Sequence, residues 1–404
     1  MSTSLLYHGF GVRGYNHVCS EYRGGGVILH IQQDLDTLRC PVCGMPNPIR
    51  RGEVVRTFRA LPIGGKPVSL VLPVQRVQCR SCGAVRQVKL GFADERRHYC
   101  RAFERYVLEL SRRMTILDVA RHLQVSWDTI KDIQKRYLLR KFAKPKLKHL
   151  KRLAVDEIAV AKGQRYLTIV LDLDSGAVVF VGTGKGAEAL DQFWKRLKSC
   201  SARIEAVAMD LSAAYQLAVR TNLPAATIVF DHFHLIKLFN EKLSDLRRDL
   251  QREAEGPLHK QVLKGTRWLL LKNPQNLDQS RNERKRLEEA LALNKPLATA
   301  YYMKEDLRQL WDQVDKAAAE HFLDDWIGRA QSSGIRMLQQ FAVTLASYRH
   351  GILAWYDYPI STAPLEGTNN KIKVLKRMAY GFRDHEFFAL KIYGIHEAKY
   401  ALVG

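Results

Sequence analysis

Two pairs of closely spaced cysteines constrain the N-terminal part of this 404-residue chain more than any other feature. Cys40 and Cys43 enclose two residues, as do Cys79 and Cys82, and a glycine follows each pair. Two such knuckles supply four thiolates that can converge on one tetrahedral Zn²⁺ ion. Two disulfides are the alternative, which an intracellular setting disfavours. Because four cysteines leave no open coordination position, we expect a zinc that stabilises a fold and takes no part in chemistry.

The 35 residues between the two cysteine pairs have the pattern of a β-hairpin. Residues 54–59 and 68–74 are alternating stretches, and Gly64 and Gly65 provide a turn between them. The pattern predicts a zinc ribbon, which we place in an N-terminal domain of residues 1–98.

The charge balance indicates a polyanionic partner. Lys and Arg number 64 and Asp and Glu 41, which gives a net charge of +23. Residues 131–152 include ten Lys or Arg and one acid, Asp132. A solubilising surface is the alternative, but charge this concentrated is better explained by contact with phosphates. No apolar run approaches the ~20 residues of a membrane span, and the N-terminus lacks a secretory signal. We therefore expect a cytoplasmic protein that binds nucleic acid and has no membrane partner.

Residues 115–137 have the pattern of a helix-turn-helix, whose second helix enters the major groove of DNA. Ser126 can cap the second helix. The buried sides of the two helices would carry Val119, Ala120 and Leu123, then Ile130, Ile133 and Tyr137. The outward face of the second helix, expected to contact DNA, would carry Trp127, Asp128, Lys131, Gln134 and Lys135. An ordinary helical hairpin is the alternative. We place this motif and the basic linker in a second domain, residues 99–150.

From residue 152 the pattern changes to strands. Residues 153–160, 165–173 and 177–182 predict a three-stranded meander. A helix (residues 187–198), a strand (204–210), another helix and a strand (227–231) follow. This β-β-β-α-β-α-β order predicts an α/β fold with an RNase H-like mixed sheet. Its first part would span residues 151–238.

Two acids occupy related positions in this sheet. Asp156 lies in the first strand and Asp210 ends the fourth, and these strands are neighbours in the RNase H-like order. Two adjacent carboxylates repel each other unless a cation such as Mg²⁺ binds between them. The alternative, that each acid caps a strand or forms a surface ion pair, explains either one alone better than it explains both.

A third metal ligand is expected from a helix near the C-terminus. Residues 361–378 predict a helix that Thr362 caps and whose first turn contains Pro364. The packed face would carry Leu365, Ile372, Leu375 and Ala379, and a second face Glu366, Asn370, Lys373 and Arg377. A carboxylate followed by amide and cationic groups suits a metal that faces a phosphodiester. A solvated amphipathic helix is the alternative.

The chain resembles the ISL3 family of DDE transposases of bacterial insertion sequences. The resemblance covers most of the chain and rests on ordered segments: CPVCG, CRSCG, LAVDEIAVAKGQRYLTIVLDLDSG, VAMDLSAAY, VFDHFHLIK, TRWLLLKNPQNL and STAPLEGTNNKIKVLKRMAYGF. It implies an RNase H-like catalytic core whose DDE triad falls on Asp156, Asp210 and Glu366. All three acids are present.

The resemblance also implies a mechanism, cofactors and partners. Two Mg²⁺ (or Mn²⁺) ions per site would support phosphoryl transfer, first by water at an element end and then by the freed 3′-hydroxyl on target DNA. Lys373 and Arg377 are the candidates for holding the cut strand. The partner would be double-stranded DNA, bound by a homodimer in a synaptic complex. Such a protein would act in the bacterial cytoplasm, associated with the nucleoid.

Three further segments allow more than one interpretation. Residues 239–358 predict an α-helical insertion, and residues 359–404 the C-terminal helices of the core. Trp268 is expected in the core of the insertion, with stacking on an unpaired base as the alternative. Asp231, His232 and His234 could bind a second metal or mark a strand end and a helix start. We prefer a role in supporting the active site or contacting DNA.

Two other functions compete with a transposase. A non-catalytic regulator would use the zinc ribbon and the helix-turn-helix alone, and it would not need three carboxylates. An RNase H-like nuclease without strand transfer would differ only in its product.

Overall fold

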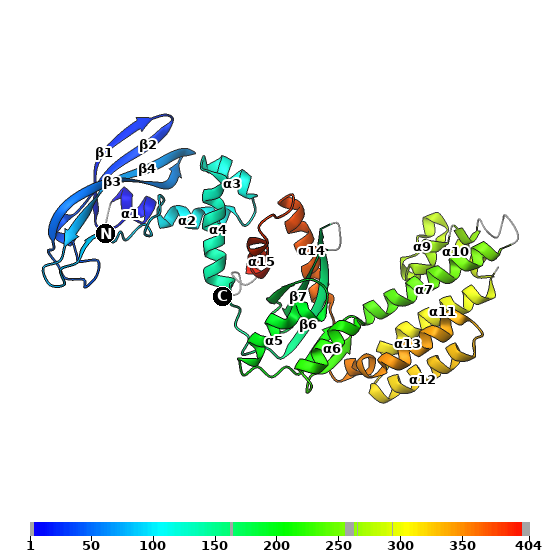
Figure 1. Cartoon of the computed structure of the whole chain (residues 1–404). Coiled ribbons are helices and arrows are strands. Elements are labelled where there is room, and N and C mark those ends of the chain that lie inside the picture. Colours follow the sequence, from blue (N-terminus) through cyan, green and yellow to red (C-terminus); the bar gives the residue numbers. More distant parts are fainter. Residues whose placement is uncertain (1–3, 162–164, 255–261, 265, 293, 398–404) are drawn as a thin grey trace. The chain divides into compact units, whose positions relative to one another are not determined.

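The computed structural model describes residues 4–161, 165–254, 262–264, 266–292 and 294–397. The chain divides into two compact units, residues 1–143 and 144–404, which are shown with their elements in Figure 1. Each unit has its own apolar core. No helix within the described ranges is long and apolar enough to cross a membrane.

The N-terminal unit begins with a short helix and a five-stranded sheet. The elements are α1 (Leu5–Phe10), β1 (Tyr15–Arg23), β2 (Gly26–Gln33), β3 (Ile49–Ile63), β4 (Lys66–Gln78) and β5 (Val85–Gln87). The strand order is β1-β2-β4-β3, and β5 pairs with β4. Alternate residues of β4 are buried, which gives this strand one face on the core. The predicted hairpin between the cysteine pairs is therefore confirmed as β3 and β4.

Three helices complete this unit: α2 (Arg101–Leu110), α3 (Ile116–Leu123) and α4 (Trp127–Phe142). Thr115 and Ser126 cap α3 and α4, since each side-chain oxygen accepts the backbone N–H three residues later. Phe103, Val119 and Ile130 of these helices pack in the same core as Phe58 of β3. The zinc ribbon and the helix-turn-helix thus share one core.

The C-terminal unit is built on a second five-stranded sheet. Its strands are β6 (Arg152–Ala161), β7 (Arg165–Asp172), β8 (Val178–Thr183), β9 (Ala206–Met209) and β10 (Thr227–Phe230). Helices α5 (Asp191–Lys198) and α6 (Ala213–Asn222) follow β8 and β9. The order is β10-β9-β6-β7-β8, with β6, β9 and β10 parallel and β6, β7 and β8 antiparallel. This is the predicted RNase H-like mixed sheet.

The two faces of this sheet pack against different helices. One face carries Val155, Val170 and Met209 and packs against Phe193 of α5 and Tyr215 of α6. The other face carries Ala154, Ile169 and Ala208 and packs against α14 (Ala363–Met378) and α15 (His385–Tyr393) through Leu365, Ile372 and Phe388. Since neighbouring residues of a strand point to opposite faces, Asp156 shares the α14 face with Ala154.

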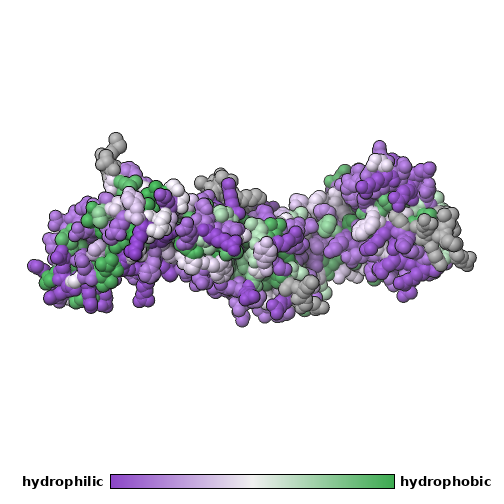
Figure 2. Space-filling view, turned by 90° about the horizontal axis from the view of Figure 1, so that it is seen from above, coloured by the Kyte–Doolittle hydropathy of each residue, from purple (hydrophilic) through white to green (hydrophobic). Residues whose placement is uncertain are grey.

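A helical insertion joins β10 to α14 (Figure 1). Its helices are α7 (His232–Glu253), α9 (Arg267–Leu271), α10 (Glu283–Ala292), α11 (Lys295–Arg308), α12 (Lys316–Ser332) and α13 (Arg336–Leu353). The domain boundary expected at residue 238 falls inside α7, so this helix runs unbroken from the sheet into the insertion. A Cβ at Gly351 would lie 2.4 Å from the Phe230 ring, so the glycine allows α13 to approach β10 closely. Figure 2 shows mainly hydrophilic residues on the visible surface of the insertion.

Candidate active site and DNA-binding elements

Three acids lie at matching positions of three adjacent parallel strands, Asp156 within β6 and Asp210 and Asp231 directly after β9 and β10. Val155 pairs with Met209 and Met209 with Phe230, so Asp156, Asp210 and Asp231 follow at matching positions of β6, β9 and β10. Neighbouring strands are about 4.8 Å apart. The prediction that the strands of Asp156 and Asp210 are neighbours is therefore confirmed.

The carboxyl group of Asp156 lies among other charged groups. Its Oδ1 accepts the backbone N–H of Glu157, and its Oδ2 accepts Nδ2 of Asn369 at 2.8 Å. Burial raises the pKa of Asp156 to about 6; nearby His234 lowers this pKa, whereas the charges of Glu157 and Asp210 raise it. A bound cation would stabilise the ionised form of this carboxyl group, because its positive charge would offset both the cost of burial and the repulsion from the neighbouring acids.

Asp231 anchors the helix that carries Glu366. This side chain is 2 % exposed, and its Oδ2 accepts both the backbone N–H of Thr362 (2.6 Å) and the Thr362 hydroxyl. Its Oδ1 caps α7 by accepting the N–H of Phe233. The predicted cap by the Thr362 side chain within α14 is wrong, because that hydroxyl donates to Asp231 instead. The contact spans 131 residues of sequence, so no local pattern could indicate it.

Asn369 fixes α14 against the first strand through its hydrogen bond to Asp156. Glu366 lies three residues earlier, so the two residues share a helix face with Cβ atoms about 5–6 Å apart. Asn370, which the sequence singled out, is exposed, whereas Asn369 is 5 % exposed. The Glu366 side chain is exposed. Among the described residues, only the four cysteines have candidate ligand atoms all within 4.8 Å of one another, so at least one pair of the three carboxylates is further apart than this.

A basic hollow lies along α14. It has a volume of about 520 Å³ and lies between the end of β6 and the C-terminal half of the helix. Lys373, Lys376 and Arg377 line it, opposite Ile158 and Val160. The two cations expected to hold the cut strand therefore lie on one surface, and Lys376 adds a third that the sequence reasoning missed.

Asp231, His232 and His234, the candidates for a second metal site, contact different parts of the structure. His232 packs on Trp311 of the insertion, with ring centroids 5.5 Å apart, whereas His234 lies near enough to Asp156 to lower the pKa of that acid. Together with the tether of Asp231 to Thr362, these contacts disfavour a shared second metal.

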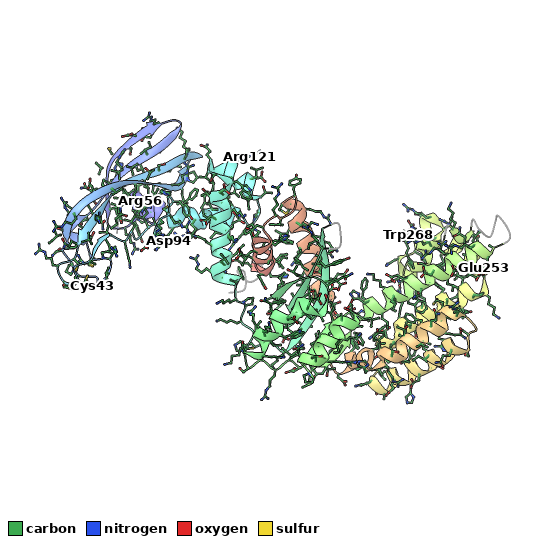
Figure 3. All side chains as sticks on the ribbon, in the orientation of Figure 1. Cys43, Arg56, Asp94, Arg121, Glu253 and Trp268 are labelled. Atoms are coloured by element: carbon green, nitrogen blue, oxygen red, sulfur yellow. The ribbon has the colours of Figure 1, made fainter. Side chains whose placement is uncertain are left out.

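Trp268 does not lie in the core of the insertion, so that expectation is wrong. Its side chain is 66 % exposed on α9, at the surface labelled in Figure 3. The guanidinium of Arg267 lies 4.8 Å from its ring centroid. The buried Lys304 donates to the carbonyl of Leu270 and so anchors α9 beneath it. Stacking on an unpaired base stays a prediction.

The four cysteines form a closed cluster in the N-terminal unit. Their Sγ atoms all lie within 4.8 Å of one another, and the pairs Cys40–Cys82 and Cys43–Cys79 are 3.7 and 3.4 Å apart. A tetrahedron with Zn–S bonds of about 2.3 Å has S–S edges of about 3.8 Å, so the set fits zinc. Backbone N–H groups of Cys43 and Val42 lower the pKa of Cys40 to about 6, whereas the neighbouring thiols raise the pKa of Cys43. A bound Zn²⁺ would favour the thiolate at all four positions.

The helix-turn-helix has one residue placed differently from expectation. Trp127 is 44 % exposed, and the Lys131 ammonium lies 5.3 Å from its ring centroid. Lys135 is half-buried. The outward position expected for Gln134 is wrong, because it is 3 % exposed and lies beside the buried Ile133 on α4.

Three family models match the chain in the order of its structural parts. A zinc-finger model of the transposases IS204/IS1001/IS1096/IS1165 matches residues 36–82. The helix-turn-helix domain of transposase family ISL3 matches residues 88–138, and the ISL3 DDE model, described as a transposase, matches residues 153–392. The chain belongs to the ISL3 family of transposases. The resemblance noted from the sequence is therefore confirmed.

Curated relatives and a solved structure are also similar to this transposase. The transposase for insertion sequence element IS1001 of Bordetella parapertussis is 35 % identical over 91 % of each chain. The transposase for insertion sequence element IS1557 of Mycobacterium tuberculosis is 28 % identical, covering 89 % of this chain and 86 % of the relative. The Drosophila P element transposase strand transfer complex is 13 % identical with a TM-score of 0.36, covering 62 % of this chain and 77 % of that one.

Proposed function

We propose that this transposase cuts DNA at the ends of its insertion sequence and joins the freed 3′-hydroxyl ends to target DNA. Asp156, Asp210 and Glu366 are the proposed carboxylate ligands of Mg²⁺ or Mn²⁺. One observation carries the proposal: Asp156 and Asp210 follow paired residues of adjacent parallel strands, and Asn369 ties the helix that bears Glu366 to Asp156.

The chemistry of these ligands suits hard divalent cations. Carboxylate oxygens are the ligands such ions prefer, and the burial that raises the pKa of Asp156 makes an unneutralised site costly. Two ions bound there would favour deprotonation of the attacking hydroxyl and stabilise the leaving oxygen. Asn369 orients the carboxylate of Asp156, and the tether from Asp231 to Thr362 holds the start of α14.

The remaining basic surfaces would position the DNA. Lys373 and Arg377 are proposed to hold the strand that is cut, in the hollow beside β6. On α4, Trp127, Lys131 and Lys135 are proposed to contact the element end, and Gln134 is left out because it is buried. Since two ends must meet before joining, the active form is proposed to be a homodimer in a synaptic complex, acting at the bacterial nucleoid.

The test uses labelled element-end duplexes with and without Mg²⁺. In Asp156→Asn, Asp210→Asn and Glu366→Gln, Mg²⁺-dependent nicking should fall by at least about 100-fold, the loss typical when a group that stabilises the transition state is removed. Binding of the duplex should be nearly unchanged, because the helix-turn-helix is intact. Glu241→Gln, an exposed acid on α7, is the matched control and should cleave as the wild type does.

Each outcome bears on one part of the proposal. A triad variant that keeps wild-type nicking removes that residue from the metal site. Nicked DNA without joined products identifies a nuclease, and bound DNA without nicks in the wild-type protein identifies a regulator.

A further inference from the structure

The N-terminal unit contains a hollow of about 950 Å³ beside the zinc knuckle. One wall is formed by Pro41 and Val42 of the knuckle, and Arg56 of β3 also lines it. The rest of the lining comes from residues 86–101, which run from the end of β5 to the first residue of α2. We call this hollow the knuckle groove. Figure 3 labels Arg56 and Asp94 of the groove and Cys43 of the knuckle.

Positive charge dominates the knuckle groove. Its basic residues are Arg56, Arg86, Lys89, Arg96, His98 and Arg101. Its acids are Asp94 and Glu95, and Asp94 already pairs with Arg101 at 2.8 Å. Concave surfaces lined by one sign of charge concentrate the electrostatic field and attract the opposite charge. The groove is therefore suited to an anion.

Three of these cations have no acidic partner in the described part of the chain. Arg86 is exposed, and its one hydrogen bond among the described residues goes to the carbonyl of the preceding residue. The exposed side chains of Lys89 and Arg96 have no ion pair or hydrogen bond among the described residues. Arg96 also has a left-handed backbone (φ 59°), which costs a residue other than glycine about 1 kcal/mol.

The groove is fixed to the helix expected to read DNA. Arg97, within the lining segment, pairs with Asp132 of α4 at 2.9 Å, and Arg136 of α4 lies 3.9 Å from Asp94. The same segment pairs with β3, where the N–H of Arg59 donates to the carbonyl of His98 at 2.8 Å. An anion in the groove would therefore have a defined position relative to α4.

We propose that the knuckle groove binds the sugar-phosphate backbone of the DNA duplex that α4 contacts. The proposal rests on DNA binding by the helix-turn-helix and adds a phosphate site beside the zinc. A duplex presents a row of phosphates, which matches several cations spread along a groove better than one small anion does. The zinc then has an indirect role, because its knuckle forms one wall of the groove.

The test compares two charge-matched triple variants of the full chain. The groove variant is Arg86→Ala, Lys89→Ala, Arg96→Asn, in which asparagine tolerates the left-handed backbone. The control variant is Arg23→Ala, Arg50→Ala, Lys66→Ala, three exposed cations of the same unit that do not line the groove. Affinity for element-end and unrelated duplexes is measured by fluorescence anisotropy over a range of salt concentrations, without Mg²⁺.

For the groove variant, affinity should fall by a similar factor on both duplexes, because phosphate contacts carry no sequence information. The slope of log affinity against log salt should become shallower by about 0.9 for each lost phosphate contact, so by about 2 to 3 in all. Zinc content and Tm should equal those of the wild type, and hydroxyl-radical footprints should lose protection on one flank of the site.

An unchanged slope in the groove variant would overturn the proposal, as would an equal loss in the control variant, which would make the effect one of total charge. A loss seen only on the element end would overturn it too. Because no Mg²⁺ is present, the result does not depend on whether the three carboxylates catalyse cleavage.

Discussion

The hydrogen bonds from Thr362 to Asp231, which we call the tether, are expected to hold the start of α14 in place, and a single substitution can test this. The perturbation is Asp231→Asn, which keeps the shape of the side chain and replaces one oxygen with an NH₂ group. Asp231 is 2 % exposed and accepts hydrogen bonds from the N–H groups of Phe233 (2.7 Å) and Thr362 (2.6 Å) and from the Thr362 hydroxyl. These bonds join the end of β10, the start of α7 and the start of α14.

The size of the effect follows from the number of donors. Asparagine has one accepting oxygen, so if it faces Thr362 the bond to Phe233 is lost, which costs about 1.5–3 kcal/mol for a charged acceptor. The two remaining bonds weaken because the acceptor becomes neutral, by about 1 kcal/mol together. A loss of about 3 kcal/mol lowers the Tm of a unit of this size by about 6–12 °C.

The assay is thermal unfolding of the full chain in Mg²⁺-free buffer, followed by circular dichroism and calorimetry. The transition of the C-terminal unit should move, and that of the zinc-containing unit should not. Asp315→Asn is the matched control, since Asp315 caps α12 with one bond at the surface and asparagine caps equally well. DNA nicking should fall with the stability of α14, because Glu366 lies in its first turn.

Two results would refute this reasoning. An Asp231→Asn protein with the Tm of the wild type would show that the tether contributes little. A loss of stability that appears only when Mg²⁺ is present would show instead that Asp231 is a metal ligand.

Other predictions follow from the same contacts. Asn369→Ala should slow nicking about tenfold to a hundredfold by removing a hydrogen bond to a carboxylate, while Asn370→Ala should stay within about twofold; equal effects would contradict the role given to Asn369. Burial raises the pKa of Asp156 to about 6, above its unfolded value near 3.8, so its contribution to stability is present below about pH 4 and is lost as pH rises through 6. In Mg²⁺-free urea titrations over this pH range, the free energy of unfolding of the wild type should fall by up to about 3 kcal/mol more than that of Asp156→Asn. Parallel pH profiles of the two proteins would contradict the effect ascribed to burial. Cys40→Ser should lower zinc content, measured by plasma emission spectroscopy, together with DNA affinity; full zinc occupancy would rule out the four-cysteine site.

Local patterns in the sequence were enough to predict the hairpin of β3 and β4, the helix-turn-helix and the order of strands and helices in the second sheet, but not α1, β1, β2 and β5. The spacing of Cys40 and Cys43 predicts a zinc knuckle, because a tight turn with a following glycine suffices to bring two thiolates together; Gly44 has φ 77°. Alternation predicts β3 and β4, and the strand and helix order predicts the sheet that brings Asp156 and Asp210 onto neighbouring strands. These features depend on residues close in sequence or on the restricted ways in which strands pair.

Only the tertiary structure decided which residues meet across long sequence separations. Helical periodicity alone does not distinguish Asn369 from Asn370 as the residue that faces β6. The docking of α14 on β6 decided that Asn369 contacts Asp156. Packing likewise buried Gln134 and left Trp268 exposed, against expectations drawn from each helix alone. The tether from Asp231 to α14 and the knuckle groove arise in the same way. Periodicity specifies the faces of an element, whereas the partner of each face depends on the whole folded chain.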